Sequence, residues 1–176
     1  MKNLIRRGPL GFLMFFCLVF GSCTEEEIIV RQQPQSNSPI VGEWTVTSIT
    51  QEEVQTTYED DVLVYENIIT GYAYDLDYNM KFNSDATLEY WGVYSYSTTF
   101  SWGTYTNENI EFDQVGKWLH EGDRLAISDP EVVGVYQIDK ITETELEIRL
   151  EQVKKGSSDG RVSEVHSIHE MKLIKK

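Results

Sequence analysis

The sequence is poor in cysteine. Its 176 residues include only two, Cys17 and Cys23, and both lie close to the N-terminus. The chain after Cys23 therefore cannot form an internal disulfide bond. Its stability has to come from a packed core, and residues 40–176 are numerous enough for one domain that buries about two thirds of its unfolded surface.

Basic residues are few compared with acidic ones. The chain contains 15 Lys and Arg against 29 Asp and Glu, and three of the basic residues, Lys2, Arg6 and Arg7, open the sequence. Without these three, 12 basic and 29 acidic residues remain, a net charge of −17. Such a surface repels nucleic acids and anionic membrane surfaces, so nucleic-acid binding is excluded as a function.

The sequence also lacks recognisable catalytic motifs. It has no nucleophile elbow, no glycine-rich phosphate loop and no zinc-binding pattern. Of its histidines, His166 and His169 are three apart on a predicted strand and so point to opposite faces, where they cannot share a metal ion. Asp75 and Asp77 share a strand face that could meet calcium, but calcium needs six or more oxygen ligands, and a solvated face is the better interpretation. We predict a protein that is not an enzyme and needs no cofactor or metal.

Residues 1–22 have the composition of a secretory signal. The basic start is followed by eleven mostly apolar residues, 10–20, and then by the small Gly21 and Ser22. This order is typical of a signal peptide, and the apolar stretch is too short to span a bilayer as a helix. Arg6-Arg7 could indicate twin-arginine export, but the surrounding residues fit that signal poorly.

Phe20-Gly21-Ser22-Cys23 resembles a bacterial lipobox, in which the cysteine becomes the first residue of the mature chain. The resemblance implies a diacylglycerol on the Cys23 thiol and usually a third acyl chain on its amine. Because each buried methylene contributes ~0.8 kcal/mol, two or three chains would anchor the protein firmly to a membrane. The alternative is an ordinary secretory signal that a cysteine happens to follow.

The run Thr24–Glu27 resembles the acidic export tag of some Gram-negative lipoproteins. That resemblance implies an outer-membrane lipoprotein facing the cell surface. The alternative is a solvated tether on a protein that faces the periplasm. Either way, residues 23–39 are predicted to be an acidic tether and polar linker, and residues 40–176 to be the folded domain.

The domain is predicted to be all-β, because no twelve-residue stretch has a helical period. Alternation in YAYDLDYNMKF predicts one strand face made of Tyr72, Tyr74, Leu76, Tyr78, Met80 and Phe82. Residues 92–97 are expected to hold a bend or a chain reversal, 154–161 a long mobile hairpin tip, and 51–70 a short helix or an extra strand. Eight to ten strands joined by turns indicate a sandwich or a barrel, and a barrel is favoured because closure hides the sheet edges.

Five segments resemble bacterial lipocalin-like lipoproteins, and together they cover nearly all of residues 40–176: IVGEWTVTSI, MKFNSDATLEY, GDRLAIS, YQIDKITETELEIRL and HEMKLIKK. The resemblance implies an antiparallel up-and-down barrel of about eight strands. Gly42 and Trp44 match the Gly-x-Trp that opens lipocalins, where the Trp closes one end of the barrel. The sequence departs from the pattern in having no C-terminal arginine to stack on that Trp, and in having Ala86 where this group often has Gly.

Nine of the ten tyrosines lie between Tyr58 and Tyr105. Tyrosines that line a barrel can hold a flat ligand or stack on sugar rings, and the candidate binding residues are Tyr74, Tyr78, Tyr90 and Trp102. The alternative is that these side chains fill the barrel, since eight strands leave room for side chains or for one small ligand. Two functions follow. One is a membrane-anchored module that binds a small hydrophobic or sugar-like ligand; the other is a surface structural or interaction protein with a filled core.

Overall fold

The fold is an eight-stranded antiparallel barrel. The computed structural model describes residues 35–128 and 133–176, so Cys23 and the acidic run 25–27 lie outside the described residues. Each strand pairs with the next, and the last pairs with the first, which closes the barrel and confirms the predicted fold class. The strands are β1 (Gly42–Glu59), β2 (Val62–Phe82), β3 (Thr87–Phe100), β4 (Gly103–Glu121), β5 (Arg124–Ser128), β6 (Val133–Ile141), β7 (Glu145–Ser158) and β8 (Arg161–Lys175).

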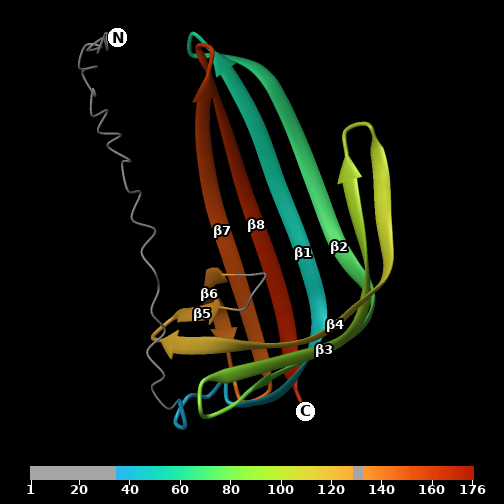
Figure 1. Ribbon diagram of the computed structural model, residues 1–176, viewed down its shortest axis with the longest axis vertical. Helices are drawn as coiled ribbons and strands as arrows, with labels where there is room; N and C mark the ends of the chain where they lie inside the picture. The colour runs from blue at the N-terminus through green and yellow to red at the C-terminus, as the bar shows by residue number, and fades with distance from the viewer. Residues whose placement is uncertain (1–34, 129–132) are drawn as a thin grey trace, which may run out of the picture.

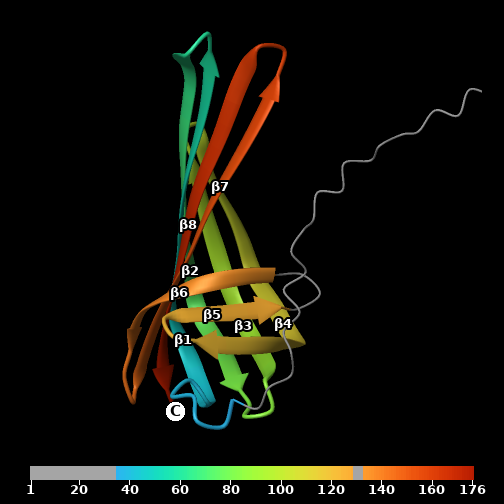
Figure 2. The same ribbon diagram turned by 90° about the vertical axis from the view of Figure 1, so that its left-hand side faces the viewer.

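The strands differ greatly in length, from 5 residues in β5 to 21 in β2. The barrel is therefore a complete ring only at its base, where the short strands β5 and β6 take part. Beyond the ring, β2, β1, β8 and β7 continue upward as a four-stranded sheet (Figures 1 and 2). We call this sheet the blade; it consists of residues 52–59, 62–70, 151–158 and 161–168. We call the hairpin formed by residues 94–110 of β3 and β4 the arm.

The base of the barrel is tightly packed. Its fully buried side chains include Trp44, Phe82, Leu88, Trp118, Leu125, Leu146 and Leu173. The two indoles are satisfied, because Trp44 Nε1 donates to the Ile40 carbonyl at 2.7 Å and Trp118 Nε1 donates to the Asn83 carbonyl at 3.1 Å. This end of the barrel is thus closed by side chains.

A lysine, Lys175, and not an arginine, stacks on Trp44. Its Nζ lies 5.1 Å from the ring centroid of Trp44, a cation–π distance. Gly42 makes room for it, because a Cβ at Gly42 would lie 2.7 Å from Lys175 Cε. The Gly-x-Trp pair and the C-terminal lysine therefore form one packed unit.

The predicted single face of β2 is wrong at its first two members. Asp75 has a φ of 51°, and the β2–β3 register shifts between Tyr74 and Asp77. This irregularity turns Tyr72 and Tyr74 to the outside of the barrel, while Tyr78 stays inside; Tyr72 is 53% exposed. One extra residue has reversed the alternation.

The other local predictions have mixed outcomes. A bend near 92–97 is confirmed, since Gly92 has a φ of 125° and β3 and β4 turn sharply there (Figure 1). The long hairpin tip is wrong, because β7 runs to Ser158 and only Asp159 and Gly160 form the turn. Residues 51–70 form strands and the turn Asp60-Asp61, so the short helix is wrong. The described residues contain no helix long and apolar enough to cross a membrane.

Candidate functional site

A cavity of about 330 Å³ lies inside the barrel, above the packed base. It exists because inward-facing residues of all eight strands surround it, so that no single hairpin could form it. Apolar and aromatic side chains predominate among its lining residues: Ile49, Tyr78, Met80, Leu88, Tyr90, Tyr94, Phe112, Ile127, Tyr136, Ile148, Leu150, His169, Glu170 and Met171.

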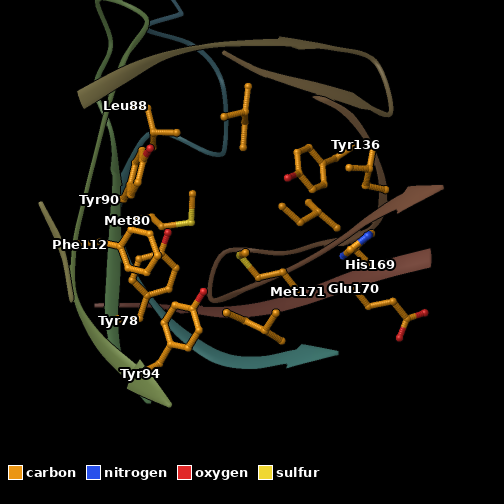
Figure 3. A pocket seen from close by; sticks show the side chains of 14 residues that line it. Tyr78, Met80, Leu88, Tyr90, Tyr94, Phe112, Tyr136, His169, Glu170 and Met171 are labelled. Carbon is orange, nitrogen blue, oxygen red and sulfur yellow. The ribbon is translucent and has the colours of Figure 1, made fainter. Parts of the chain in front are cut away.

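An aromatic cluster from β2, β3 and β4 forms one wall of the cavity (Figure 3). Tyr94 and Phe112 are stacked, with ring centroids 5.4 Å apart and planes at 9°. Tyr78 packs against both rings at 5.7–5.8 Å and meets the Tyr90 ring edge-on at 6.4 Å. Such contacts stabilise the wall beyond simple burial and hold its rings in a defined orientation.

The opposite wall comes mainly from the second half of the chain. Tyr136, His169 and Met171 face the aromatic cluster across the cavity, whereas Glu170 points away from it (Figure 3). These residues lie on β6 and β8, far in sequence from the tyrosine-rich region. None of them was predicted as a site residue from the sequence, and neither were Tyr94 and Phe112. Only Tyr94 carried a usable signal, since it lies at an even-numbered position shortly after the candidate residue Tyr90.

Two of the four candidate binding residues line the cavity and two do not. Tyr78 and Tyr90 are buried in its wall. Tyr74 lies outside it, with its ring 6.1 Å from that of Tyr72. Trp102 is 72% exposed at the tip of the arm, stacked on Phe100 at 4.9 Å. The expectation that all four share one cavity is thus wrong for Tyr74, because of the irregularity at Asp75, and for Trp102, because it lies in the turn between β3 and β4.

A hydrogen bond crosses the barrel just above the cavity. Tyr96 Oη donates to Gln51 Oε1 at 3.0 Å, joining β3 to β1, which are not neighbours in the sheet. Tyr96 follows the lining residue Tyr94 by two positions, and Gln51 follows the lining residue Ile49 by two. Both side chains therefore lie on the inner face of their strands, just past the cavity. Gly71 of the intervening strand β2 allows this crossing, since a Cβ there would overlap the Tyr96 ring and hydroxyl. The bond narrows the space between the arm and the blade at the top of the cavity.

The cavity carries no net positive charge. None of its lining residues is a lysine or arginine. Burial lowers the pKa of His169, and the nearby Glu53 only partly opposes this shift, so the imidazole is neutral at neutral pH. Burial raises the pKa of Tyr94 and, reinforced by Tyr94 itself, raises that of Tyr96 to about 12. The lining groups that face inward are therefore uncharged at neutral pH, which suits an uncharged ligand.

The two C-terminal histidines point to opposite faces, as predicted. His169 faces the cavity, while His166 lies on the outer face of the blade with Nε2 2.8 Å from Glu151 Oε1. Within residues 35–128 and 133–176, no three His, Cys, Asp or Glu side chains are placed to hold a metal ion.

Comparison with known proteins identifies a family. No curated protein and no solved structure matches the chain. A family model with the description "Domain of unknown function (DUF5004)" matches residues 22–119, which run from just before Cys23 to the end region of β4. The match spans more than half of the 176 residues and includes the strands that form the aromatic wall. The chain therefore belongs to the DUF5004 family.

Proposed function

We propose that this protein is a lipid-anchored cell-envelope lipoprotein whose lipocalin-like barrel binds a small, uncharged and largely apolar molecule. The observation that carries the binding proposal is the cavity of about 330 Å³ lined by residues of all eight strands. Ligand pockets are typically apolar cavities of roughly 300–1,000 Å³ with a few polar groups that orient the ligand. This cavity lies at the small end of that range.

The size and lining of the cavity define the class of ligand. An apolar cavity of about 150 Å³ can bind benzene, so a cavity of this volume suits a molecule of about two fused rings. The stacked Tyr94 and Phe112 offer a flat surface for such rings. An ionised carboxylate or phosphate would lose its hydration without gaining a cationic partner from the lining residues, which disfavours anionic ligands.

The binding proposal is tested with a matched pair of probes. Full-length protein, freed of co-purifying molecules by unfolding and refolding, is titrated calorimetrically with 2-naphthol and with 2-naphthoate. We expect the neutral probe to bind at least tenfold more tightly. Leu150→Phe, which puts a bulkier ring into the cavity, should weaken this binding, while Val153→Phe on the outer face of the same strand should leave it unchanged. If neither probe binds, or if Leu150→Phe binds as the native protein does, the ligand proposal fails and the surface structural protein with a filled core is favoured.

The anchor proposal rests on the sequence alone. The junction 20–23 resembles a lipobox, so Cys23 is the proposed site of lipidation and the membrane the proposed partner of the N-terminus. Cys23→Ser should accumulate as an uncleaved precursor that does not incorporate labelled palmitate. Incorporation by the variant would contradict the proposal.

The proposed location is the outer membrane, with the domain facing the cell surface. The support is the acidic run 25–27 directly after Cys23. Replacing its three glutamates with alanine should reduce cleavage by external protease without reducing the total amount of lipoprotein. Unchanged cleavage would favour the simple tether and leave the orientation without support.

A further inference from the structure

The blade has two free edges. On one side, β2 pairs with β3 only up to Thr70, so residues 62–69 have no strand neighbour beyond β1 among residues 35–128 and 133–176. On the other side, β7 pairs with β6 only up to Arg149, so residues 150–158 have no strand neighbour beyond β8 in the same described part of the chain. A free edge presents unpaired backbone N–H and C=O groups, to which another strand can add.

The β2 edge has few of the features that normally prevent such addition. It reads VLVYENII, with Glu66 as its one charged residue and no lysine or proline, and Val62, Val64 and Ile68 are each at least half exposed. The β4 edge, along the arm and just below it, is different, because it carries Glu108, Glu111 and Asp113 and is interrupted at Asn109, with a φ of 54°. Charges and irregularities of this kind oppose strand addition, so the β2 edge is the more suitable site.

We propose that the β2 edge of one copy pairs with the β7 edge of a second copy, joining their blades into one continuous antiparallel sheet. The strand order in the blade is β2-β1-β8-β7, and every pair is antiparallel. β2 and β7 therefore run in opposite directions. A second blade placed beside the first in the same orientation brings its β2 antiparallel to β7, as strand addition requires.

The side chains at the two edges match when two copies lie level. The pairing across one blade places Ile68, Val54, His166 and Val153 in one row. Glu66, Thr56, Glu164 and Lys155 pair in the same way and form a second row. This row lies two residues further along each strand, so its side chains are on the same face as those of the first row. In the joined sheet Ile68 thus lies beside Val153 of the second copy, and both are about half exposed in the single molecule, at 52% and 51%. Glu66 lies beside Lys155, an acid beside a base, and both cross-strand pairs are favourable.

Charge favours this arrangement over pairing of two β2 edges. A two-fold β2–β2 contact would bring together two edges of the same acidic charge, each with Glu66 on β2 and Asp60 and Asp61 in the preceding turn. The β7 edge instead offers Lys154 and Lys155. Because the two surfaces that meet are different, the contact does not close on itself and can repeat in a row of copies. A single strand pair is a small interface, so the association is expected to be weak and dependent on concentration.

Zero-length cross-linking tests the contact directly. A 1:1 mixture of ¹⁴N- and ¹⁵N-labelled full-length protein is treated with a carbodiimide, which joins a carboxylate to an amine that touches it. We expect mixed-isotope peptides that link Glu66 to Lys155, in a yield that rises with protein concentration. The link from Lys155 to Glu164, 2.8 Å apart within one copy, should carry a single isotope and serves as the internal control. Detection of that control without any mixed-isotope Glu66–Lys155 link would overturn the proposal.

Charge exchange provides the second measurement. Glu66→Lys alone and Lys155→Glu alone should each reduce self-association at least fivefold in sedimentation velocity. The double variant should restore self-association. A mixture of the two single variants should also restore it, because position 66 of either variant carries the charge opposite to that at position 155 of the other. If the double variant associates no better than the single variants, or if cross-links join β2 to β2, this pairing is wrong.

Discussion

Gly92 marks the residue at which β3 changes direction to form the arm. Its φ of 125° lies in a region that other residues rarely adopt. In addition, a Cβ at this position would overlap the backbone carbonyl of Asp77 on the neighbouring strand. The contact is with backbone, so a side-chain rotation cannot relieve it.

Gly92→Ala is therefore expected to destabilise the protein by at least about 2–4 kcal/mol, through backbone strain and the loss of strand pairing around Tyr78. Gly156→Ala is the matched control, because a Cβ there meets nothing within 4 Å. It should change the free energy of unfolding by less than about 0.5 kcal/mol. Urea melts followed by circular dichroism measure both variants, and equal effects would mean that the close approach at Gly92 does not constrain the fold.

At the scale of elements, β2 shows what an alternating pattern can and cannot predict. From Leu76 to Phe82 the alternation predicts the inner face correctly, because these residues pack in or against the core. Tyr72 and Tyr74 continue the same even-numbered alternation toward the start of β2, but they face outward. The reason is the positive φ of Asp75, where the register between β2 and β3 shifts. Aspartate adopts this conformation without a distinctive neighbour pattern, so the irregularity left no sign in the sequence.

The inner face of β2 can be tested by a neighbouring pair of substitutions. Leu76→Asp should lower the free energy of unfolding by about 2–4 kcal/mol, since it places a charge against the core and removes apolar packing. Asp77→Ala changes an exposed residue and should cost less than about 0.5 kcal/mol. Similar small losses in chemical denaturation would show that this part of β2 does not face a core.

The blade strands could not be predicted from alternation for a different reason. Alternation arises when one face of a sheet is buried and the other is in water. In the blade, apart from the buried Asn67, Ile69 and Ser167, the side chains on both faces are at least partly accessible. Apolar residues such as Ile68 and Val153 therefore lie on the outer face, while Gln55 and Thr57 lie on the inner one. Residues 51–70 therefore showed no clear period, although they form some of the longest strand pairing in the molecule.

At the scale of the whole molecule, the cavity is a product of closure. The sequence predicted a barrel and two wall residues, Tyr78 and Tyr90, from local patterns. It did not predict Tyr136 or His169, because they reach the cavity only when the last three strands complete the ring. Which residues meet across a barrel depends on the register of every strand pair, and short turn signals do not fix that register.

Burial of His169 in this ring predicts a pH dependence of stability. Its pKa is near 6.5 in the unfolded chain and lower in the folded state. Between these two pKa values the unfolded chain binds more protons than the folded chain, so protonation favours unfolding. The contribution of His169 is therefore fully present above pH 6.5 and is lost as the pH falls toward the folded pKa. The free energy of unfolding of the native protein should decrease more between pH 7.5 and 5.5 than that of His169→Gln.

His169→Asn is the second variant for that measurement and should show the same weakened pH dependence as His169→Gln. Comparing variants at each pH cancels the general effect of titrating the many carboxylates. Identical pH profiles for native protein and His169→Gln would mean that the cavity does not disfavour a protonated imidazole.

The pairing of β1 with β8 has a consequence for how the chain comes to be folded. Seven of the eight strand contacts join neighbours along the chain, but the eighth joins residues near position 42 to residues near 175, and Lys176 bonds to Glu43 at 2.7 Å. Contacts between distant residues form late, because the intervening chain must first be ordered. During synthesis β1 emerges first and β8 last of the eight strands, so the edge of β1 that pairs with β8 stays unprotected until β8 has been made. A chain that lacks β8 would accordingly expose the backbone hydrogen-bonding groups along one edge of β1, and such an unpaired edge promotes aggregation.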